Sequence, residues 1–499
     1  MGETDLYPCV PLEMSADRLD DLVDKAKTYA LMHGICMRRK DAFDTDALHF
    51  APFVLFPSPF PRKEFNKAIE IQTILNELMH KVAHDDDFLR ESLKNTIQVD
   101  DFTGRLFQLY DKVQKHGGSA QELSLGMLRS DLMLDNHCCP IDSKCKLNGQ
   151  AFCCWKQVEL NTIASGFGWL GPASGLLHRY VVQEAGYPEH LKNIPENNAL
   201  SGLANALVNS WKLYNQPKSV ILFLVEDVTY NICDQKFHEF EIREQCPEVF
   251  VIRKTLTEIG NRGKLTEDKR LIIDGHEVAV IYMRCGYHPD QYPSEVEWDA
   301  RFMMEMSLAI KSPSVHYHLA GTKKVQQELA KPGVLEKFLG DKAKIESVRD
   351  IFTGLYSLDK DEIGNASFQR AIETPEKFVL KPQREGGGNN VYGADIKPFL
   401  EKIADSDERS AYILMDMIEP PITTNYMVRP GEAPLLAKCI SELGIFGYVI
   451  GTKDSILENK QVGHMLRTKL SHVNEGGVAA GLGALDSVYL VDASRCCLN

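Results

Sequence analysis

The residues best suited to chemistry lie in one segment around residue 380. The pattern predicts a strand, residues 378–381, that ends in a lysine and runs into a loop made of Pro382, Gln383, Arg384, Glu385, Gly386, Gly387, Gly388, Asn389 and Asn390. Backbone N–H groups in a glycine run can converge on an anion, and such a loop can open and close over it. Lys381 supplies a positive charge for phosphate, and Glu385 supplies a hard oxygen ligand for Mg²⁺. The alternative is a flexible surface turn, which the charged and amide side chains around the glycines disfavour.

A second pair of candidate metal ligands lies on a predicted strand around residue 159. Residues i and i+2 of a strand share a face, so Glu159 and Asn161 point to the same side. Val158 and Leu160 would then point into the core. A carboxylate beside an amide oxygen suits Mg²⁺. Taken alone, this pattern is more typical of a solvated strand face, and only its combination with the glycine loop makes it a candidate site.

Two further segments carry cations suited to a nucleotide. Lys323 and Lys324 stand at the start of a predicted helix, where the helix dipole also favours phosphate. Arg467 and Lys469 precede a small-residue loop at residues 475–481, and an arginine can bind a substrate carboxylate through two hydrogen bonds. Taken singly, these segments are more typical of a solvated basic helix start and of a surface charge pair beside a tight turn.

Other known motifs either match in their residue pattern alone or are absent from the sequence. Residues 166–171 fit the G-x-G-x-x-G pattern of dinucleotide-binding proteins, but the bulky Phe167 and Trp169 would crowd a pyrophosphate. The sequence contains no P-loop, no G-x-S-x-G elbow and no H-E-x-x-H motif. His316 and His318 could be a metal-binding pair on a strand, but without a third ligand they are more typical of packing.

The composition is that of a globular protein. The 499 residues would make about three domains at ~150 residues each. Hydrophobic residues make up 44% and charged residues 25% of the chain, and the net charge is −14. Such an acidic surface argues against nucleic acid or an anionic membrane as partner, so an anionic substrate needs a local basic pocket. The N-terminus shows no secretory signal and no apolar stretch is long enough to span a membrane, which predicts a cytoplasmic protein.

Thirteen cysteines without an export signal indicate mostly reduced thiols. Five of them, beside His137, are crowded into one segment: Cys138, Cys139, Cys145, Cys153 and Cys154. No C-x-x-C pair is present, so a loop insertion over residues 135–154 is favoured over a structural zinc site.

The predicted elements change character along the chain. Helical patterns dominate at first, in residues 15–33, 65–82 and 104–116. From residue 124, strands at 125–134, 152–160, 219–225, 249–252 and 278–283 alternate with helices at 174–184, 203–214 and 295–310. The last third favours short antiparallel strands with little helix, at 378–381, 412–415, 437–440, 445–450 and 463–469. The fold class is therefore α/β, or mixed α+β, with a partly parallel sheet.

Five blocks of sequence together resemble the eukaryotic-type glutathione synthetase family of the ATP-grasp superfamily. They are KPQREGGGNN (381–390), LAGTKKVQQEL (319–329), ISELGIFG (440–447), RTK (467–469) and GGVAAG (476–481). The resemblance covers nearly the whole chain. It implies an ATP-grasp architecture, usually as a homodimer, that joins γ-glutamylcysteine and glycine with ATP and Mg²⁺ through an acyl-phosphate.

The resemblance also assigns roles to single positions. Glu159, Asn161 and Glu385 would hold magnesium, and Lys323, Lys381 and Arg467 would supply charge for catalysis. ATP would be bound by Glu159, Lys323, the loop 381–390, Tyr392, Met415, Asp416, Met417, Ile418, Glu442, Lys469 and Glu475. The peptide substrates would contact Arg129, Ile163, Ala164, Ser165, Gly166, Asn231, Gln235, Arg284, Cys285, Gly286, Tyr287, Arg467, Val478 and Ala479.

Several positions depart from the family pattern. Cys285 stands where Asp is common in R-D-G-Y, and Thr229 and Tyr230 replace more strongly charged residues. Asp416-Met417 stands where Glu-Lys is frequent, and Glu475 where Asp is frequent. Two alternatives remain open beside the main prediction, and the second of them is disfavoured by the intact set of Lys381, Glu385, Arg467 and Lys469. One is a ligase with another acceptor, such as β-alanine, and the other is a non-catalytic nucleotide-binding module.

The expected division has three parts. Residues 1–219 would form the helical N-terminal part and the first portion of the ATP-grasp core, and residues 220–318 an embedded α/β substrate-binding subdomain. Residues 319–499 would complete the core, with a glycine-rich lid at 381–393 and an Ala/Gly-rich loop at 475–483.

If the cysteine-rich segment is an insertion, replacing Cys138, Cys139, Cys153 and Cys154 together with serine should leave most of the activity. Metal analysis of the purified protein and thermal melting of the variant are the measurements. Stoichiometric zinc that is lost in the variant together with folding would show instead a structural metal site.

Overall fold

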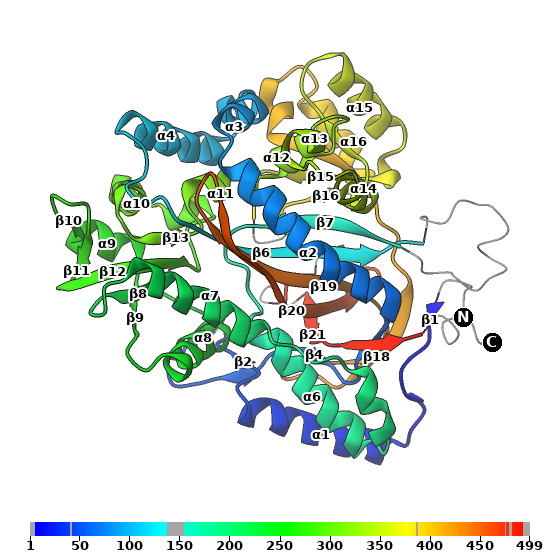
Figure 1. The fold of residues 1–499 in the computed structure, drawn as a ribbon. Coiled ribbons are helices and arrows are strands. Elements are labelled where there is room, and N and C mark those ends of the chain that lie inside the picture. Colours follow the sequence, from blue (N-terminus) through cyan, green and yellow to red (C-terminus); the bar gives the residue numbers. More distant parts are fainter. Residues whose placement is uncertain are drawn as a thin grey trace.

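The computed structural model describes residues 5–39, 42–136, 154–385, 388–474, 476–478 and 482–492. Its elements form a mixed α/β fold built around three main sheets (Figure 1). The largest has eight strands in the order β1 (Asp5–Leu6), β18 (Ile422–Val428), β4 (Phe53–Val54), β21 (Gly483–Asp486), β20 (Ile456–Leu470), β19 (Leu435–Gly451), β6 (Ser124–Leu134) and β7 (Trp155–Asn161). It is mostly antiparallel, with β1–β18 and β21–β4 parallel.

The second sheet is largely parallel and lies between residues 220 and 312. Its order is β10 (Lys264–Leu265), β11 (Leu271–Ile273), β12 (His276–Met283), β8 (Val220–Leu224) and β9 (Phe250–Lys254), with β13 (Ile310–Ser312) beside β12. Strands β8, β9, β12 and β13 run parallel, as expected for a strand–helix alternation.

The third sheet is antiparallel and comes from the last third of the chain. Its order is β14 (Leu355–Ser357), β17 (Tyr412–Asp416), β15 (Phe378–Pro382) and β16 (Val391–Tyr392). Strands β15 and β16 flank the glycine loop, with Val379 opposite Tyr392. Two short pairs complete the strands: β2 (Cys36–Met37) with β3 (His49–Phe50), and β5 (Ser58–Pro61) with β22 (Val488–Val491).

The helices cover these sheets. They are α1 (Ala16–Met32), α2 (Arg62–Ala83), α3 (Asp86–Leu93), α4 (Asp101–Lys115), α6 (Leu170–Glu184), α7 (Ala199–Tyr214), α8 (Ile232–Gln245), α9 (Leu256–Arg262), α10 (Glu295–Met306), α11 (Val315–Ala320), α12 (Lys323–Leu329), α13 (Leu335–Phe338), α14 (Lys342–Ile351), α15 (Glu362–Glu373) and α16 (Ile396–Lys402). Within the described residues, none is long and apolar enough to cross a membrane.

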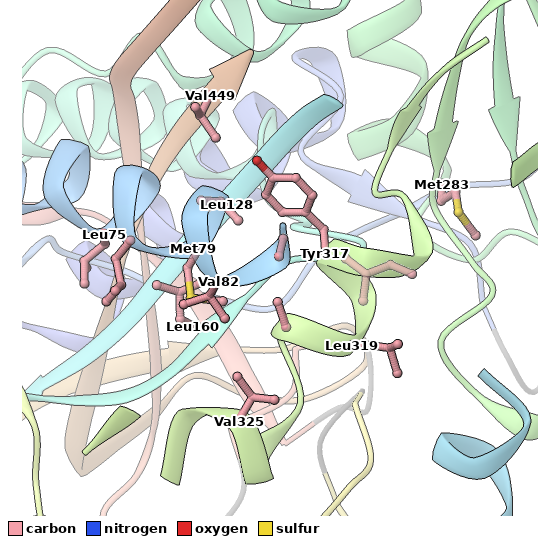
Figure 2. Close-up of a cluster of buried hydrophobic side chains, with 14 of the residues drawn as sticks. Leu75, Met79, Val82, Leu128, Leu160, Met283, Tyr317, Leu319, Val325 and Val449 are labelled. Atoms are coloured by element: carbon pink, nitrogen blue, oxygen red, sulfur yellow. The ribbon is translucent and has the colours of Figure 1, made fainter. Parts of the chain in front are cut away.

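The long helix α2 anchors the core. Its apolar stripe, predicted from residues 65–82, packs across β6 and β19 (Figure 1). Leu75, Met79 and Val82 from this helix lie among side chains of the large sheet and of α11 (Figure 2). All three are at most 1% exposed, so each removes nearly its full side-chain area from water. The stripe covers one face of the large sheet, whose strand β19 is buried on both faces from Leu443 onward.

Two expectations for the last third are wrong. Residues 437–440 and 445–450 are not separate short strands but one 17-residue strand, β19, paired along its length with the 15-residue β20. Gly444 and Gly447 allow the strand to continue, because they have no side chain. The space that a side chain would need is filled by Met465 at Gly444 and by Asn76 at Gly447. The region also contains more helix than expected, since α14, α15 and α16 lie beside the third sheet.

Close packing under α11 gives a test of this fold. A Cβ atom at Gly126 would lie 2.5 Å from the ring of Tyr317, which is fully buried and hydrogen-bonded to His80. Gly126→Ala should therefore lower the free energy of unfolding by about 1–3 kcal/mol, as overpacked cores do. The matched control is Gly175→Ala in the interior of α6, where nothing lies within 4 Å. It should be neutral or stabilising by up to ~1 kcal/mol. Thermal melting that shows equal effects of both substitutions would contradict this account.

Candidate functional site

A cavity of about 640 Å³ lies between the large sheet and the third sheet. Its wall on one side comes from β6, β7, β19 and β20, and on the other from β15, β16 and β17. Residues after β7, β17 and β20 and the start of α12 add to the lining. A cavity of this size suits a nucleotide together with part of a second small molecule.

The centre of the cavity is an ammonium group between two carboxylates. Lys323 Nζ lies 2.9 Å from Glu159 Oε2 and 2.8 Å from Glu385 Oε1. The three residues come from β7, from the first turn of α12 and from the segment that follows β15. Segments that are more than 60 residues apart in sequence thus meet at one charge cluster.

The pKa values in this cluster follow from burial and pairing. Burial alone would raise the pKa of Glu159, but the neighbouring Lys323 and Lys381 outweigh it and hold that pKa well below its usual range. Burial raises the pKa of Glu385, and Lys323 offsets this only in part. For Lys323, the two carboxylates outweigh burial and raise the pKa of the ammonium group. The cluster therefore keeps a buried cation, and Glu385 stands to gain from any further positive charge.

Lys381 is a second buried cation beside this cluster. It is 5% exposed, and its Nζ donates a hydrogen bond to the carbonyl of Val158 at 2.8 Å. Burial lowers the pKa of this ammonium group. Val158 was expected in the core, but it lines the cavity, while Leu160 is buried as expected.

A third charged group is centred on Asp131, which the sequence analysis missed. This fully buried carboxylate accepts two hydrogen bonds from Arg129, at 2.6 and 2.7 Å, and one from Asn161 at 3.0 Å. Arg467 lies 3.6 Å from it and also pairs with Glu442. The available sequence signal was the i, i+2 spacing of Arg129 and Asp131, which places both side chains on one face of a strand. In the structure β6 pairs with β7, so that Arg129 lies opposite Asn161 and Asp131 opposite Glu159.

Most of the residues expected to bind ATP or metal line the cavity. These are Glu159, Asn161, Lys323, Lys381, Arg384, Glu385, Asn389, Asn390, Tyr392, Met415, Asp416, Met417, Ile418, Glu442 and Lys469. Pro382, Gln383 and Gly388 do not line it, and Gln383 instead accepts a hydrogen bond from the backbone of Lys324. Lys324 points away as well, to an ion pair with Asp359 at 2.7 Å. Gly386, Gly387 and Glu475 lie outside the described residues.

The apolar part of the lining was only partly expected. Beside Met415, Met417 and Ile418, the cavity is lined by Met133, Val379, Ile422, Ile440 and Val473. Their sequence signal is weak, because an apolar residue on a strand is as typical of a core as of a pocket wall.

The residues expected to contact the peptide substrates divide into two groups. Arg129, Ile163, Ala164, Tyr287, Arg467 and Val478 line the cavity. Ser165, Gly166, Asn231, Gln235, Arg284, Cys285 and Gly286 do not, and Ala479 lies outside the described residues. Some of the second group lie directly behind the first: Gly166 accepts a hydrogen bond from Arg129 through its carbonyl.

In the loop after β7, which carries the G-x-G-x-x-G pattern, an acidic side chain occupies the backbone N–H groups. The carboxylate of Asp234 accepts hydrogen bonds from the backbone N–H groups of Phe167, Trp169 and Leu170, at 3.0–3.2 Å. These N–H groups stand at the start of α6, where a pyrophosphate would otherwise bind. Ala164 and Phe167 have positive φ angles of 49° and 77° and both line the cavity. Backbone strain of this kind is held by the surrounding contacts and is typical of binding loops.

The histidine pair and the cysteines show no metal site in the part of the chain that the structure describes. His316 and His318 lie on helix α11, not on a strand, and His316 packs edge-on against Tyr110. No group of three potential ligands is found among the described residues. Six of the cysteines described are free, as expected for mostly reduced thiols, and Cys154 is disulfide-bonded. The other four cysteines of the cluster lie outside the described residues.

Comparisons with known proteins show the family of the chain. The family described as "Eukaryotic glutathione synthase, ATP binding domain" matches residues 16–490. The glutathione synthetase of Xenopus laevis is 43% identical over 475 residues, which cover 95% of this chain and 97% of the relative. That of Homo sapiens is 40% identical with the same coverage, and the chloroplastic enzyme of Solanum lycopersicum is 44% identical over 89% of this chain and 78% of its own. A solved structure, the apo form of a glutathione synthetase-like effector from Globodera pallida, is 27% identical, covers 97% of this chain and 100% of its own, and has a TM-score of 0.77.

Proposed function

The chain belongs to the eukaryotic glutathione synthase family, and we propose that it joins γ-glutamylcysteine and glycine to form glutathione while ATP is split into ADP and phosphate. The observation that carries this proposal is the buried cluster of Lys323 between Glu159 and Glu385, with Lys381 and Arg467 in the same cavity. Such a set of charges can hold a triphosphate and its metal ions beside a substrate carboxylate.

The residues of the cluster fit Mg²⁺. Glu159 and Glu385 offer carboxylate oxygens and Asn161 an amide oxygen, which are the hard ligands that this ion prefers. Burial raises the pKa of Glu385, Glu159 adds to this rise, and Lys323 offsets it only in part. We assign Glu159, Asn161 and Glu385 as the ligands. When bound, Mg²⁺ would neutralise charge on the phosphates and on the transferring phosphoryl group.

The reaction needs an activated carboxylate. The cysteinyl carboxylate of γ-glutamylcysteine attacks the γ-phosphorus of ATP, which forms a C–O–P bond and releases ADP. The amine of glycine then attacks the acyl carbon, so that the C–O bond breaks, phosphate leaves and the amine loses a proton. Lys323, Lys381 and Arg467 stabilise the negative charge that develops in both steps. No side-chain nucleophile is required.

Water must be kept from the acyl-phosphate, which would otherwise hydrolyse. We assign this role to a lid formed by residues 381–393, which include the segment between β15 and β16, together with the loop at 475–483. Both belong to the proposed ATP-grasp architecture. The division into parts at 1–219, 220–318 and 319–499 is supported by the second sheet, whose strands all lie between residues 220 and 312. A homodimer and a cytoplasmic location belong to the same proposal, and light scattering tests the first.

The product of ATP cleavage is the first test. Purified protein with ATP, Mg²⁺, γ-glutamylcysteine and glycine should form ADP, phosphate and the tripeptide in equal amounts. AMP and pyrophosphate would show adenylyl transfer and would contradict the proposal. The same assay with β-alanine in place of glycine determines whether the acceptor is the expected one, since the departures at Thr229 and Cys285 lie in the expected substrate region.

Glu385→Gln tests the metal assignment. The change keeps the size and polarity of the side chain but removes its charge, while Lys323 keeps its partner Glu159. Loss of a metal ligand at the transferring phosphoryl group should cost several kcal/mol in the transition state. At ~1.4 kcal/mol per tenfold, kcat should fall by roughly a thousandfold.

The measurement is steady-state kinetics over a Mg²⁺ titration, together with thermal melting. The control is Glu336→Gln, which breaks an exposed ion pair with Arg349 and should leave kcat unchanged. If kcat of Glu385→Gln stays within about threefold at every Mg²⁺ concentration, Glu385 is not a metal ligand.

A further inference from the structure

A chain of hydroxyl and carboxylate groups, buried at Thr468 and Asp486, lies on the back of the strands that carry the site cations. Thr468 Oγ1 donates a hydrogen bond to Asp486 Oδ2 at 2.5 Å, and it lies 2.7 Å from Ser441 Oγ. Because the Thr468 proton goes to the carboxylate, Ser441 is the donor in the second contact. Thr468 and Asp486 are 1% and 0% exposed. This chain of groups, Ser441–Thr468–Asp486, is called the polar clip below.

The far end of the polar clip is fixed to the rest of the fold. Asp486 Oδ1 accepts hydrogen bonds from the backbone N–H groups of Ser487 at 2.7 Å and Ser58 at 3.2 Å. Beside it, His178 of α6 lies 2.7 Å from both Ser487 Oγ and the carbonyl of Val54. Burial lowers the pKa of His178 to about 4, so this ring is neutral and bridges the two groups. Asp486 is therefore held directly by the start of β5 and by the residue after β21, and His178 links that residue, Ser487, to β4.

Strand alternation places the polar clip opposite the cavity. Thr468 lies between Arg467 and Lys469 on β20, so its side chain points to the other face of the sheet. Ser441 is paired with Thr468 across the strands, and its neighbour Glu442 is paired with Arg467. Arg467, Lys469, Glu442 and Ile440 all line the cavity. Each member of the polar clip on β19 and β20 thus sits directly behind residues of the site.

We propose that Thr468 is a positioning residue of the ligase site. Its hydroxyl, fixed by Asp486, ties β20 to β21 and, through Ser441, to β19, and so sets the direction of Arg467 and Lys469 on the cavity face. The inference rests on the proposed function, since Arg467 and Lys469 are the groups expected at the substrates. A displacement of about 1 Å at a reacting centre can cost on the order of 100-fold in rate, so a small rotation of β20 is enough to matter.

The test compares two substitutions of Thr468 with a matched control. Thr468→Val keeps the shape and removes the hydroxyl, whereas Thr468→Ser keeps the hydroxyl. The control is Thr423→Val on β18 of the same sheet: Thr423 is 4% exposed, its neighbour Ile422 lines the cavity, and its hydroxyl has no hydrogen-bond partner among the described residues. The readouts are kcat and KM for ATP from ADP release, the affinity for ATP by calorimetry, and melting temperature.

Thr468→Val should lower kcat/KM for ATP at least tenfold and weaken ATP binding, at a temperature where the variant is folded. Thr468→Ser should stay within about threefold of the wild type, and Thr423→Val should match the wild type. A Thr468→Val protein that melts earlier but keeps kcat/KM within threefold would show a merely structural role. Equal losses in the serine and valine variants would also overturn the proposal, because the hydroxyl would then be irrelevant.

If Thr468→Val does not fold, Ser441→Ala tests whether the polar clip positions the site. Ser441 is only partly buried and at the end of the polar clip, so its removal should be tolerated. A fall of at least threefold in kcat/KM supports the proposal, and an unchanged value contradicts it. Failure of the proposed function is distinct from either result, because the wild-type protein would then release no ADP with these substrates.

Discussion

The structure depends most on one buried interaction, the ammonium group of Lys323 between the carboxylates of Glu159 and Glu385. It joins a strand of the large sheet, the start of α12 and the glycine-loop segment of the third sheet. Buried charges are costly unless they are paired, and removal of one partner typically costs about 3–5 kcal/mol because the other is left unpaired. The paired charges therefore link the large sheet, α12 and the third sheet at the cavity.

Other buried polar partners hold the strands of the site in place, both on the cavity side and on the back of the sheet. Toward the cavity, Arg129 and Arg467 are held in place by the buried carboxylate of Asp131. Away from it, Thr468 and Asp486 fix the same strands by hydrogen bonds. The protein is acidic as a whole, with a net charge of −14, so anionic substrates are attracted only where these cations are concentrated. The acidic partners within the cavity keep the cations oriented before any phosphate is bound.

Local patterns predicted local features well. The apolar stripe on α2 and the shared face of Glu159 and Asn161 followed from helix and strand periodicity. The length of β19 did not, because Gly444 reads as a break in a strand when its tightly packed surroundings are not visible. Asp131 was missed for a related reason: a carboxylate on an apolar strand becomes meaningful only once its cross-strand neighbours are known. Family resemblance, rather than spacing, supplied most of the predicted peptide-binding residues.

The central chemical step of the proposed reaction is the transfer of a phosphoryl group to a substrate carboxylate in this cavity. The most direct measurement uses γ-glutamylcysteine labelled with ¹⁸O in its cysteinyl carboxylate, with ATP, Mg²⁺ and glycine, and mass spectrometry of the phosphate formed. An acyl-phosphate requires that one carboxylate oxygen leaves with the phosphate, so each phosphate should carry one ¹⁸O atom. Unlabelled phosphate, with the label retained in the peptide or found in AMP, would contradict the proposed step.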